Sequence, residues 1–289
     1  MSKQIVIYHA DCLDGLGSAW VAYRQFHDSA RYVPARYGDP FPDLDIGDTI
    51  FILDFSYPPD VMAAAGGKAE KILLLDHHQT ALSEYDTYLI NHSLPAYVTA
   101  RFSQEFSGCV MAWHTFEGER NVPMILQHIQ DRDLWKFELP GTREITTALY
   151  NRLPISLSEF GSIDLDELSK EGTLQVKLVD RAISRLLKGR HRVKLAGVEG
   201  LAVNAPAMYS SELGHELAKL SGTFGMTYHF AGERGQWICS LRSIGDLDVG
   251  TMAKQFGGGG HHNAAGFKLA HSEFLLFIGD AKPEKSISH

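Results

Sequence analysis

The sequence has few cysteines, and this scarcity excludes two classes of protein. Its cysteines are Cys12, Cys109 and Cys239, which are odd in number, far apart and in no paired spacing. A disulfide scaffold and a zinc site built from cysteine pairs are therefore excluded. Isolated thiols fit a reducing compartment, and residues 1–4 lead into a short apolar run without the features of a signal peptide. We therefore expect a cytoplasmic protein.

Long apolar runs and positive charge are also scarce. No stretch reaches the ~18 apolar residues that a membrane span needs, so we expect no membrane partner. The 27 basic residues are outnumbered by 35 acidic ones, which gives a formal net charge of -8. This balance argues against a continuous basic groove for long duplex nucleic acid. A small anionic substrate stays compatible, because a bound cation can supply positive charge locally.

Three short apolar segments predict a parallel β-sheet. Residues 5–9, 49–55 and 71–78 are continuously apolar and too short for typical helices, as expected of strands covered on both faces. Helical patterns over 15–28 and 58–70 separate them, and a proline opens the second. This alternation predicts an α/β fold with an open, mainly parallel sheet, whose ligands lie beyond the carboxyl ends of the strands.

The remaining sequence predicts further helices and a second, smaller unit. A helical pattern extends from Ser107, a candidate cap, to about residue 135, and another covers 174–190. After it come a predicted hairpin, a helix and two strands, which indicate an α+β unit. We expect an N-terminal domain over 1–155, a helical linker over 156–190, a C-terminal domain over 191–289 and a frayed tail from 281.

Polar side chains follow each of the predicted strands. The residues at the three strand ends are His9, Asp54, Asp76, His77 and His78, and Asp11 and Asp14 lie in the first strand-to-helix turn. Carboxylates brought this close repel one another, a cost that cations normally offset. Mixed imidazole and carboxylate ligands suit Mn²⁺, Zn²⁺ or iron, and Mg²⁺ is tolerated. The competing interpretation of the two turn aspartates is that they cap the following helix.

A further aspartate pair lies near the end of the predicted helix at 107–135. Asp131 and Asp133 flank Arg132, and an exposed polar pair is the competing interpretation. If Asp131 joins the strand-end cluster, the number of ligands suffices for two cations. Asp54 could then bridge them at a separation of about 3.5–4 Å.

The last polar cluster lies between residues 250 and 267. Four consecutive glycines precede His261, His262 and Asn263, and we expect a loop whose backbone N–H groups wrap an anion. A flexible linker is the alternative, but the run lies inside a folded domain. Arg242 stands at the end of a predicted strand, where its guanidinium can bind a phosphate unless it is a plain surface residue.

These motifs, and their order along the chain, resemble those of the DHH phosphoesterase superfamily. The matching segments are HADCLDG from His9, Asp54, Asp76-His77-His78, Asp131 and the C-terminal GGGGHHNAAGF. The resemblance extends from residue 5 to about residue 267. Within the superfamily, the motifs resemble more specifically those of nanoRNase and pAp phosphatase-like proteins with a C-terminal DHHA-type domain. Each motif is short, but their ordered combination is specific.

The resemblance implies two divalent ions, with Mn²⁺ favoured and Mg²⁺ as the alternative. The implied metal ligands are His9, Asp11, Asp14, Asp54, His77 and Asp131. It also implies that Asp54 bridges the ions, that His78 contacts the scissile phosphate and that Asp76 orients the motif. Relatives commonly carry D-x-D where this chain has Asp11-Cys12-Leu13-Asp14. Cys12 therefore stays open as an alternative to Asp11, and Asp133 as an alternative to Asp131.

The resemblance also implies that the C-terminal domain binds the rest of the substrate. The implied substrate-binding residues are Arg242, Ser243, Gly258, Gly259, Gly260, His261, His262 and Asn263. Arg242 and His261 would in addition assist catalysis by neutralising phosphate charge, alongside Asp76 and His78 in the first domain.

We therefore predict a metal-dependent phosphoesterase that hydrolyses short oligoribonucleotides, 3'-phosphoadenosine 5'-phosphate-like nucleotides or both. Its expected partners are these small substrates, with a homodimer left open. A pyrophosphatase or exopolyphosphatase could share the metal cluster, but the sequence has no lysine-rich second domain. A catalytically silent nucleotide-binding protein and a trans-editing module are further alternatives, which the full set of candidate ligands disfavours.

Overall fold

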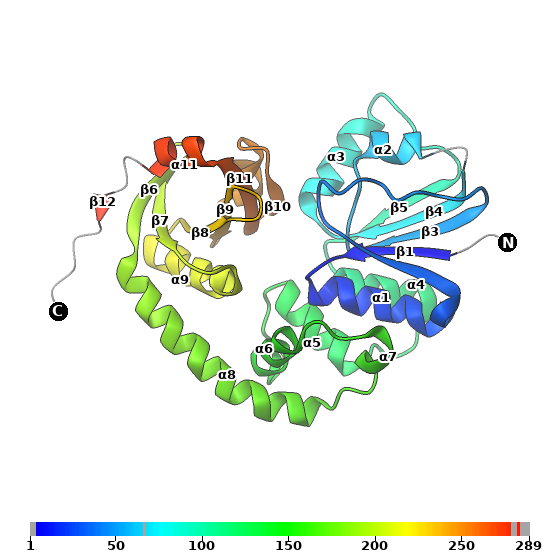
Figure 1. The fold of residues 1–289 in the computed structure, drawn as a ribbon, viewed down its shortest axis with the longest axis horizontal. Helices are drawn as coiled ribbons and strands as arrows, with labels where there is room; N and C mark the ends of the chain where they lie inside the picture. The colour runs from blue at the N-terminus through cyan, green and yellow to red at the C-terminus, as the bar shows by residue number, and fades with distance from the viewer. Residues whose placement is uncertain (1–3, 66–67, 279–281, 284–289) are drawn as a thin grey trace. The chain divides into compact units, whose positions relative to one another are not determined.

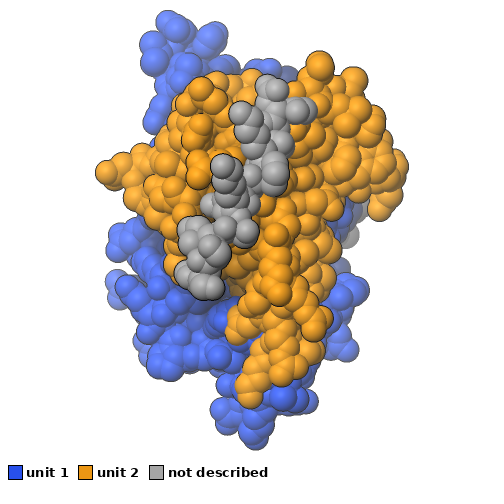
Figure 2. Space-filling model, turned by 90° about the vertical axis from the view of Figure 1, so that its left-hand side faces the viewer, with its two compact units in different colours: residues 1–176 blue, residues 177–289 orange. Residues whose placement is uncertain are grey.

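The computed structural model describes residues 4–65, 68–278 and 282–283, and the chain forms two compact units, residues 1–176 and 177–289 (Figure 2). The division falls inside one long helix, α8 (Leu165–Leu186). Among the described residues, none of the helices combines the length and the apolar character needed to cross a membrane.

A five-stranded sheet with only parallel pairings forms the centre of the first unit. Its order is β2-β1-β3-β4-β5. The strands are β1 (Gln4–His9), β2 (Ala30–Ala35), β3 (Asp48–Leu53), β4 (Ala69–Asp76) and β5 (Val98–Phe102). The predicted α/β class is confirmed, and the three predicted strands correspond to β1, β3 and β4.

The central strands bury both of their faces because successive side chains point to opposite sides. On β3, Ile50 and Ile52 pack into one core while Phe51 and Leu53 pack into the other. This explains the continuous apolar runs in the sequence. The edge strands β2 and β5 were not predicted, because exposed polar residues such as Arg31 interrupt their apolar pattern.

Helices cover both faces of this sheet (Figure 1). One face carries α1 (Leu13–Phe26), α4 (Gly108–Glu117) and α5 (Met124–Asp133), and the other carries α2 (Pro59–Ala64) and α3 (Gln79–Leu89). The unit continues with α6 (Thr142–Arg152), α7 (Leu157–Phe160) and the start of α8, and a short 3-10 turn, His27–Ser29, follows α1.

Two predicted helices differ from the observed ones. The helix expected over 58–70 ends at Ala64, since β4 already begins at Ala69. The helical segment expected over 107–135 is two helices, because Gly118 adopts a left-handed φ of 67° and Pro123 starts a new helix. The break turns α5 back, so that its last turn can approach the strand ends.

The second unit contains a seven-stranded sheet of order β10-β11-β9-β8-β7-β6-β12. Only β7 and β8 pair in parallel. The strands are β6 (His191–Leu195), β7 (Val198–Asn204), β8 (Phe224–Ala231), β9 (Gln236–Ser243), β10 (Gly259–His261), β11 (Ala264–Ala270) and β12 (Lys282–Pro283). The expected α+β unit is therefore present. Apart from β12, the tail from residue 281 lies outside the described residues.

Two apolar cores flank this second sheet. The helices are α9 (Ser210–Ser221), α10 (Val249–Lys254) and α11 (His271–Ile278), with 3-10 turns at Leu187–Gly189 and Ala207–Tyr209. Leu213 and Leu217 of α9 pack on Leu201 and Val203 of β7. The opposite face of the sheet packs against α10 and α11 through a larger cluster that includes Met226.

Candidate metal centre

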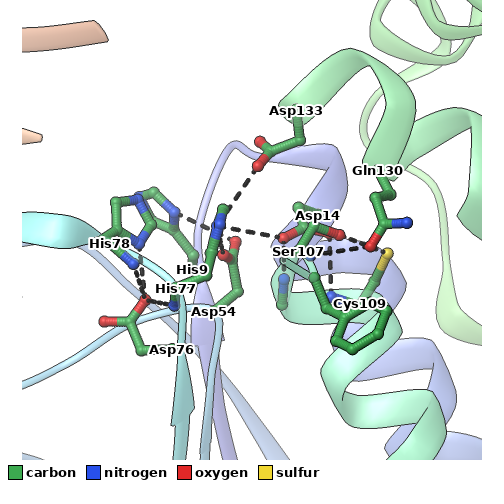
Figure 3. Close-up of polar contacts among 12 residues, drawn as sticks. His9, Asp14, Asp54, Asp76, His77, His78, Ser107, Cys109, Gln130 and Asp133 are labelled. Carbon is green, nitrogen blue, oxygen red and sulfur yellow. Dashed lines mark hydrogen bonds and ion pairs between the residues drawn. The ribbon is translucent and has the colours of Figure 1, made fainter. Parts of the chain in front are cut away.

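The carboxyl ends of three adjacent parallel strands gather the candidate ligands. β1 lies between β2 and β3, so the chain leaves β1 towards one side of the sheet and returns on the other. Such a switch point is where open α/β sheets bind ligands. The gathered residues are His9 at the end of β1, Asp54 after β3, Asp76, His77 and His78 at and after the end of β4, Asp14 of α1 and Asp133 of α5 (Figure 3).

His77 is the centre of this cluster. Its Nε2 lies 3.1 Å from Asp54 Oδ1, 3.4 Å from Asp133 Oδ2 and 3.6 Å from Asp14 Oδ2. His9 approaches Asp54 from the other side, with 3.4 Å between His9 Nδ1 and Asp54 Oδ2. His77, Asp54 and Asp14 are almost completely buried. Side chains from four separate segments therefore meet within coordination distance of one another.

The backbone at Asp54 is held in a rare conformation. Its φ of 57° is left-handed, which non-glycine residues seldom adopt. Gly108, at the start of α4, fits against it so closely that an added Cβ would lie 2.4 Å from Asp54 Cβ. The turn after β3 and the start of α4 thus fix the direction of the Asp54 carboxylate.

Asp14 joins the cluster while it caps a helix distant in sequence. Its carboxylate accepts hydrogen bonds from the backbone N–H groups of Gly108, at 2.6 Å, and Cys109, at 3.0 Å. The hydroxyl of Ser107 donates to it as well, at 2.7 Å. Ser107 holds the N-cap position of α4 as predicted, but its side chain makes no capping bond, because Asp14 takes that role. These donors fix Asp14 Oδ2 near His77.

Asp76 holds the two histidines that follow it. Its Oδ1 accepts hydrogen bonds from the backbone N–H groups of His77, at 2.7 Å, and His78, at 3.1 Å, and lies 2.7 Å from His78 Nδ1. Its Oδ2 accepts the hydroxyl proton of Ser56. An oxygen engaged with His78 Nδ1 fixes the proton on that nitrogen, so Nε2 is the nitrogen directed away from Asp76. Asp76 thus has the contacts of an orienting residue.

Three buried polar atoms of the cluster have no hydrogen-bond partner among the described residues. They are His9 Nδ1, Asp54 Oδ2 and Asp133 Oδ2. A buried polar atom without a partner is costly, so such atoms indicate a missing ligand. Imidazole nitrogens and carboxylate oxygens are donors to Mn²⁺, Zn²⁺ and iron. The residues therefore fit a divalent cation, and the unpartnered atoms mark where it would bind.

The protonation equilibria of the cluster show the same need for positive charge. Burial raises the pKa of the Asp14 carboxyl well above 3.8, and Asp54 and Asp133 add to the rise. Burial would lower the pKa of the His77 imidazole, but Asp133, Asp54 and Asp14 together raise it to about 10. Without a cation, protons on these groups offset the crowded negative charge. A divalent cation would replace them.

The candidate ligand atoms of the cluster form overlapping groups, one of which contains Asp54, Asp76 and His78. Two others are joined to each other. Asp14, His77 and Asp133 bring one ligand atom each within 4.8 Å of one another, and a second group of the same compactness contains His9 and Asp54. The 3.1 Å contact between His77 and Asp54 joins the groups. Asp54 therefore lies between His9 and His77, with one carboxylate oxygen near each.

Two residues predicted as metal ligands lie outside these groups. The carboxylate of Asp131 accepts hydrogen bonds from the N–H groups of Glu138 and Leu139 and from the hydroxyl of Thr142, so it closes the turn after α5. Asp11 is exposed and forms an ion pair with Arg36 at 2.5 Å. The structure brings Asp133 to His77 in place of Asp131.

A helical pattern in the sequence could have selected Asp133. It follows Leu126 and Ile129 at i+7 and i+4, on the face of α5 that packs in the core, whereas Asp131 lies on the other face. No pattern in the sequence indicated that Tyr37 lies at the cluster. Its ring lies edge-on to His9 and His78, at centroid distances of 5.6 Å and 5.8 Å.

In the second unit, Arg242 is held at the end of β9. Its Nη2 donates to Ser211 Oγ at 2.7 Å, and its Nη1 donates to the carbonyl of Leu241 at 2.8 Å. Its aliphatic stem packs on Gly214 of α9, where a Cβ would lie 2.9 Å from Arg242 Cγ. The guanidinium is therefore a positioned group and not a mobile surface charge.

Ser243 and Asn263 bind to each other. Asn263 Nδ2 donates to Ser243 Oγ at 2.9 Å and to the carbonyl of Gly245 at 3.0 Å, and Ser243 Oγ donates to the carbonyl of Leu247 at 2.7 Å. These bonds fasten the turn after β9 to the turn between β10 and β11. Both side chains thus have a structural role in shaping this end of the sheet.

The second half of the glycine run belongs to strand β10, whereas Gly257 and Gly258 precede it, so the expected loop is wrong for Gly259 and Gly260. Gly259 and Gly260 pair with β11 together with His261, and His262 lies in the following turn. A Cβ at Gly258 would lie 2.1 Å from the carbonyl oxygen of Gly266, and Gly260 has a φ of 143°. Close approach to β11 therefore accounts for part of the glycine requirement.

Comparison with known proteins places these features in a family. Residues 206–280 match the DHHA1 domain. The chain is 26% identical to oligoribonuclease NrnB of Bacillus subtilis over 319 aligned positions, which cover 95% of this chain and 75% of NrnB. These matches support a protein of the DHH superfamily that is similar to the nanoRNases. The part that matches DHHA1 contains Arg242 and strand β10, and the Asp76-His77-His78 motif lies at the centre of the strand-end cluster.

Two further proteins are similar to this chain. An uncharacterised protein of Acanthamoeba polyphaga mimivirus is 29% identical over 304 aligned positions, which cover 92% of this chain and 67% of that protein. Among solved structures, the pGpG-specific phosphodiesterase PggH from Vibrio cholerae aligns with a TM-score of 0.49 and 13% identity, covering 96% of this chain and 98% of PggH.

Proposed function

We propose that this DHH protein is a two-metal phosphoesterase that hydrolyses short oligoribonucleotides, 3'-phosphoadenosine 5'-phosphate-like nucleotides or both. The observation that carries the proposal is the strand-end cluster, in which buried His9, Asp54 and Asp133 atoms lack hydrogen-bond partners among the described residues. Similarity to the oligoribonuclease NrnB along 95% of the chain supports the substrate class. The net charge of -8 favours short substrates, because a long polyanion would be repelled.

Each metal position draws on its own set of side chains. Asp14, His77 and Asp133 would hold one divalent ion, and His9 and Asp54 would contribute to the other, with Asp54 shared. Mn²⁺ is the proposed metal and Mg²⁺ the alternative. A pair of such ions supplies Lewis acidity and lowers the pKa of water, so that hydrolysis proceeds near neutral pH.

The protein's own residues would position the phosphate. Because Asp76 engages His78 Nδ1, the opposite nitrogen of His78 is presented for a hydrogen bond to the scissile phosphate. In the second unit, Arg242 would bind a further phosphate of the substrate, since its stem and Nη2 are already held by Gly214 and Ser211. His261, Gly258, Gly259, Gly260, His262, Ser243 and Asn263 stay proposed as substrate-binding residues, and His261 also as a catalytic one.

The proposed domain roles follow the two units. Residues 1–155 would form the metal-binding phosphoesterase domain, residues 156–190 a helical linker, and residues 191–289 the substrate-binding domain. Each unit has its own apolar cores, which supports a division of this kind.

A substrate panel with Mn²⁺, Mg²⁺ or EDTA tests this proposal. The panel contains dinucleotides, 3'-phosphoadenosine 5'-phosphate, cyclic dinucleotides, pyrophosphate and polyphosphate. We expect hydrolysis of the first two substrates in Mn²⁺ and none in EDTA. Asp54→Asn and His77→Ala should each lose at least ~100-fold in kcat/KM and should bind Mn²⁺ weakly by calorimetry.

The control for the panel is Asp60→Asn, which removes an exposed carboxylate of α2. It should retain full activity and full Mn²⁺ affinity. Exclusive hydrolysis of pyrophosphate or polyphosphate would reject the proposed substrate class. Undiminished turnover by Asp54→Asn would reject the metal centre itself.

A further inference from the structure

Cys12 lies inside the strand-end cluster. It is the residue before α1, in extended conformation and partly buried, in the turn that leaves β1. Its Sγ, a ring nitrogen of His9 and a carboxylate oxygen of Asp54 lie within 4.8 Å of one another. A thiol therefore completes the group to which His9 and Asp54 belong.

Asp54 and His9 independently indicate a ligand at this place. Asp54 is 1% exposed and its Oδ2 has no hydrogen-bond partner among the described residues. The nearest nitrogen of His9 is 3.4 Å away and is also without a hydrogen bond in the described part of the chain. A buried acceptor and a buried ring nitrogen that face each other with a thiol beside them form a three-donor cation site.

The other group, Asp14, His77 and Asp133, contains no sulfur. The two halves of the cluster therefore differ in chemistry. Thiolate is a soft ligand that favours Zn²⁺, Co²⁺ and Fe²⁺, whereas Mg²⁺ prefers oxygen ligands. A centre with one sulfur-containing half would discriminate between metals at that half alone.

We propose that Cys12, with His9 and Asp54, coordinates one of the two cations through its sulfur and makes this position selective for Zn²⁺, Co²⁺ or Fe²⁺ over Mg²⁺. The proposal rests on the metal centre of the proposed function and assigns the specificity of one of its halves. Cys12 is a specificity-determining ligand here, and the other half remains an oxygen- and nitrogen-donor position.

The competing role for Cys12 is that of a small apolar residue. The other two cysteines show that role. Cys109 Sγ lies 3.5 Å from Ser107 Oγ and 3.8 Å from the carbonyl oxygen of Leu126, and Cys239 is fully buried in the core of the second unit. Neither belongs to a group of potential metal ligands among the described residues. Cys239 is therefore a matched control.

Cobalt absorption spectroscopy of the full chain tests the proposal. Sulfur bound to Co²⁺ produces an intense near-ultraviolet charge-transfer band, which nitrogen and oxygen ligands do not produce. We expect this band in the native chain and in Cys239→Ser, and we expect Cys12→Ser to lose it. Cys12→Asp should bind Co²⁺ without the band and should lower the ratio of Zn²⁺ to Mg²⁺ affinity, measured by competition calorimetry, by about tenfold or more.

The outcomes separate this proposal from the proposed function. Cobalt binding by the native chain without the band, or a band that persists in Cys12→Ser or Cys12→Asp, overturns the role of Cys12 and leaves the phosphoesterase function standing. Failure of the native chain to bind either Co²⁺ or Mn²⁺ overturns the metal centre and the function with it. Should Cys12→Ser not fold, Cys12→Asp and the native spectrum still decide the question.

Discussion

At the scale of single residues, Asp54 combines a strained backbone with a buried carboxylate. Its φ of 57° is an unfavourable conformation for aspartate, and its Oδ2 has no hydrogen-bond partner in the described residues. Strain of this kind costs about 1–3 kcal/mol and persists only where the surroundings enforce it. The close contact with Gly108 is part of that enforcement.

Gly108→Ala should therefore displace Asp54. An added Cβ would lie 2.4 Å from Asp54 Cβ. We expect a loss of about 1–3 kcal/mol in the free energy of unfolding, as for overpacking, together with weaker Mn²⁺ binding. Chemical denaturation and calorimetry measure the two effects. Gly232→Ala, where a Cβ would meet nothing within 4 Å, should change neither. If Gly108→Ala binds Mn²⁺ with native affinity, the contact with Gly108 does not hold Asp54 in its observed conformation.

The two aspartates of α5 should respond in opposite ways. Asp131→Asn removes a carboxylate that accepts bonds from Glu138, Leu139 and Thr142, so the free energy of unfolding should fall by about 1–3 kcal/mol while Mn²⁺ still binds. Asp133→Asn should abolish tight Mn²⁺ binding without destabilising the metal-free protein, because it removes one of the carboxylates that repel one another in the cluster. Calorimetry and urea unfolding of both variants provide the comparison. If Asp131→Asn lost Mn²⁺ binding and Asp133→Asn retained it, Asp131 would be the ligand.

The contribution of Asp131 should depend on pH. Burial raises the pKa of its carboxyl, but the Thr142 hydroxyl and the N–H groups of Glu138 and Leu139 bring it below 3.8. A depressed folded-state pKa stabilises the fold above the unfolded value and loses this effect as the pH falls through the folded value. The difference in unfolding free energy between the native chain and Asp131→Asn should thus be full at neutral pH and shrink below pH 3.8. A difference that stays constant as the pH falls well below 3.8 would contradict the role of the charge.

At the scale of elements, α1 and α4 are joined at both ends. Asp14 of α1 caps the start of α4, and Glu117 at the end of α4 accepts hydrogen bonds from Arg24 Nε at 3.0 Å and Gln25 Nε2 at 3.2 Å. Arg120 also pairs with Glu117. The two helices therefore move together, and they carry Asp14 and the Gly108 contact with them.

Glu117→Gln should loosen this pair of helices. The side chain of Glu117 is buried, and an amide cannot retain all of its hydrogen bonds to Arg24, Gln25 and Arg120. We expect the free energy of unfolding to fall by about 1–3 kcal/mol in urea titrations at neutral pH. Glu119→Gln, which changes an exposed neighbour, should be neutral. Equal stability of the two variants would mean that the contact does not hold the helices.

The sequence predicted the elements that carry the site because central parallel strands are apolar on both faces and end abruptly in polar residues. It therefore placed His9, Asp54 and His77 at one edge of the sheet, as observed. It could not predict that Asp14 caps α4, since the two lie 94 residues apart and no local pattern links them. It favoured Asp131 over Asp133 as a ligand, because the break at Gly118, which sets the direction of α5, was not predicted.

At the scale of the whole molecule, the candidate metal ligands and the proposed phosphate-binding residue Arg242 lie in different units. The candidate metal ligands lie before residue 176, whereas Arg242 lies in the unit that matches DHHA1. A substitution in one unit should therefore change one property and spare the other.

Arg242→Ala should raise KM for short oligoribonucleotides by about tenfold with a smaller change in kcat, because a charged hydrogen bond to a remote phosphate acts on binding. Its Mn²⁺ affinity should equal that of the native chain. Arg234→Ala, an exposed arginine in the turn between β8 and β9, should leave both properties unchanged. A fall in kcat with constant KM would place Arg242 in the transition state instead.

The order of the five-stranded sheet has a further consequence. The strands that end at His9, Asp54 and Asp76 occupy its interior, and both marginal strands, β2 and β5, carry none of the gathered ligands. Opening of β2 or β5 by heat or by a mutation would leave the strands that end at His9, Asp54 and Asp76 paired with one another. Activity should consequently survive the first local unfolding events, and insertions in the connections before β2 or before β5 should be tolerated. The connection after β2 differs, because it carries Tyr37, whose ring contacts His9 and His78.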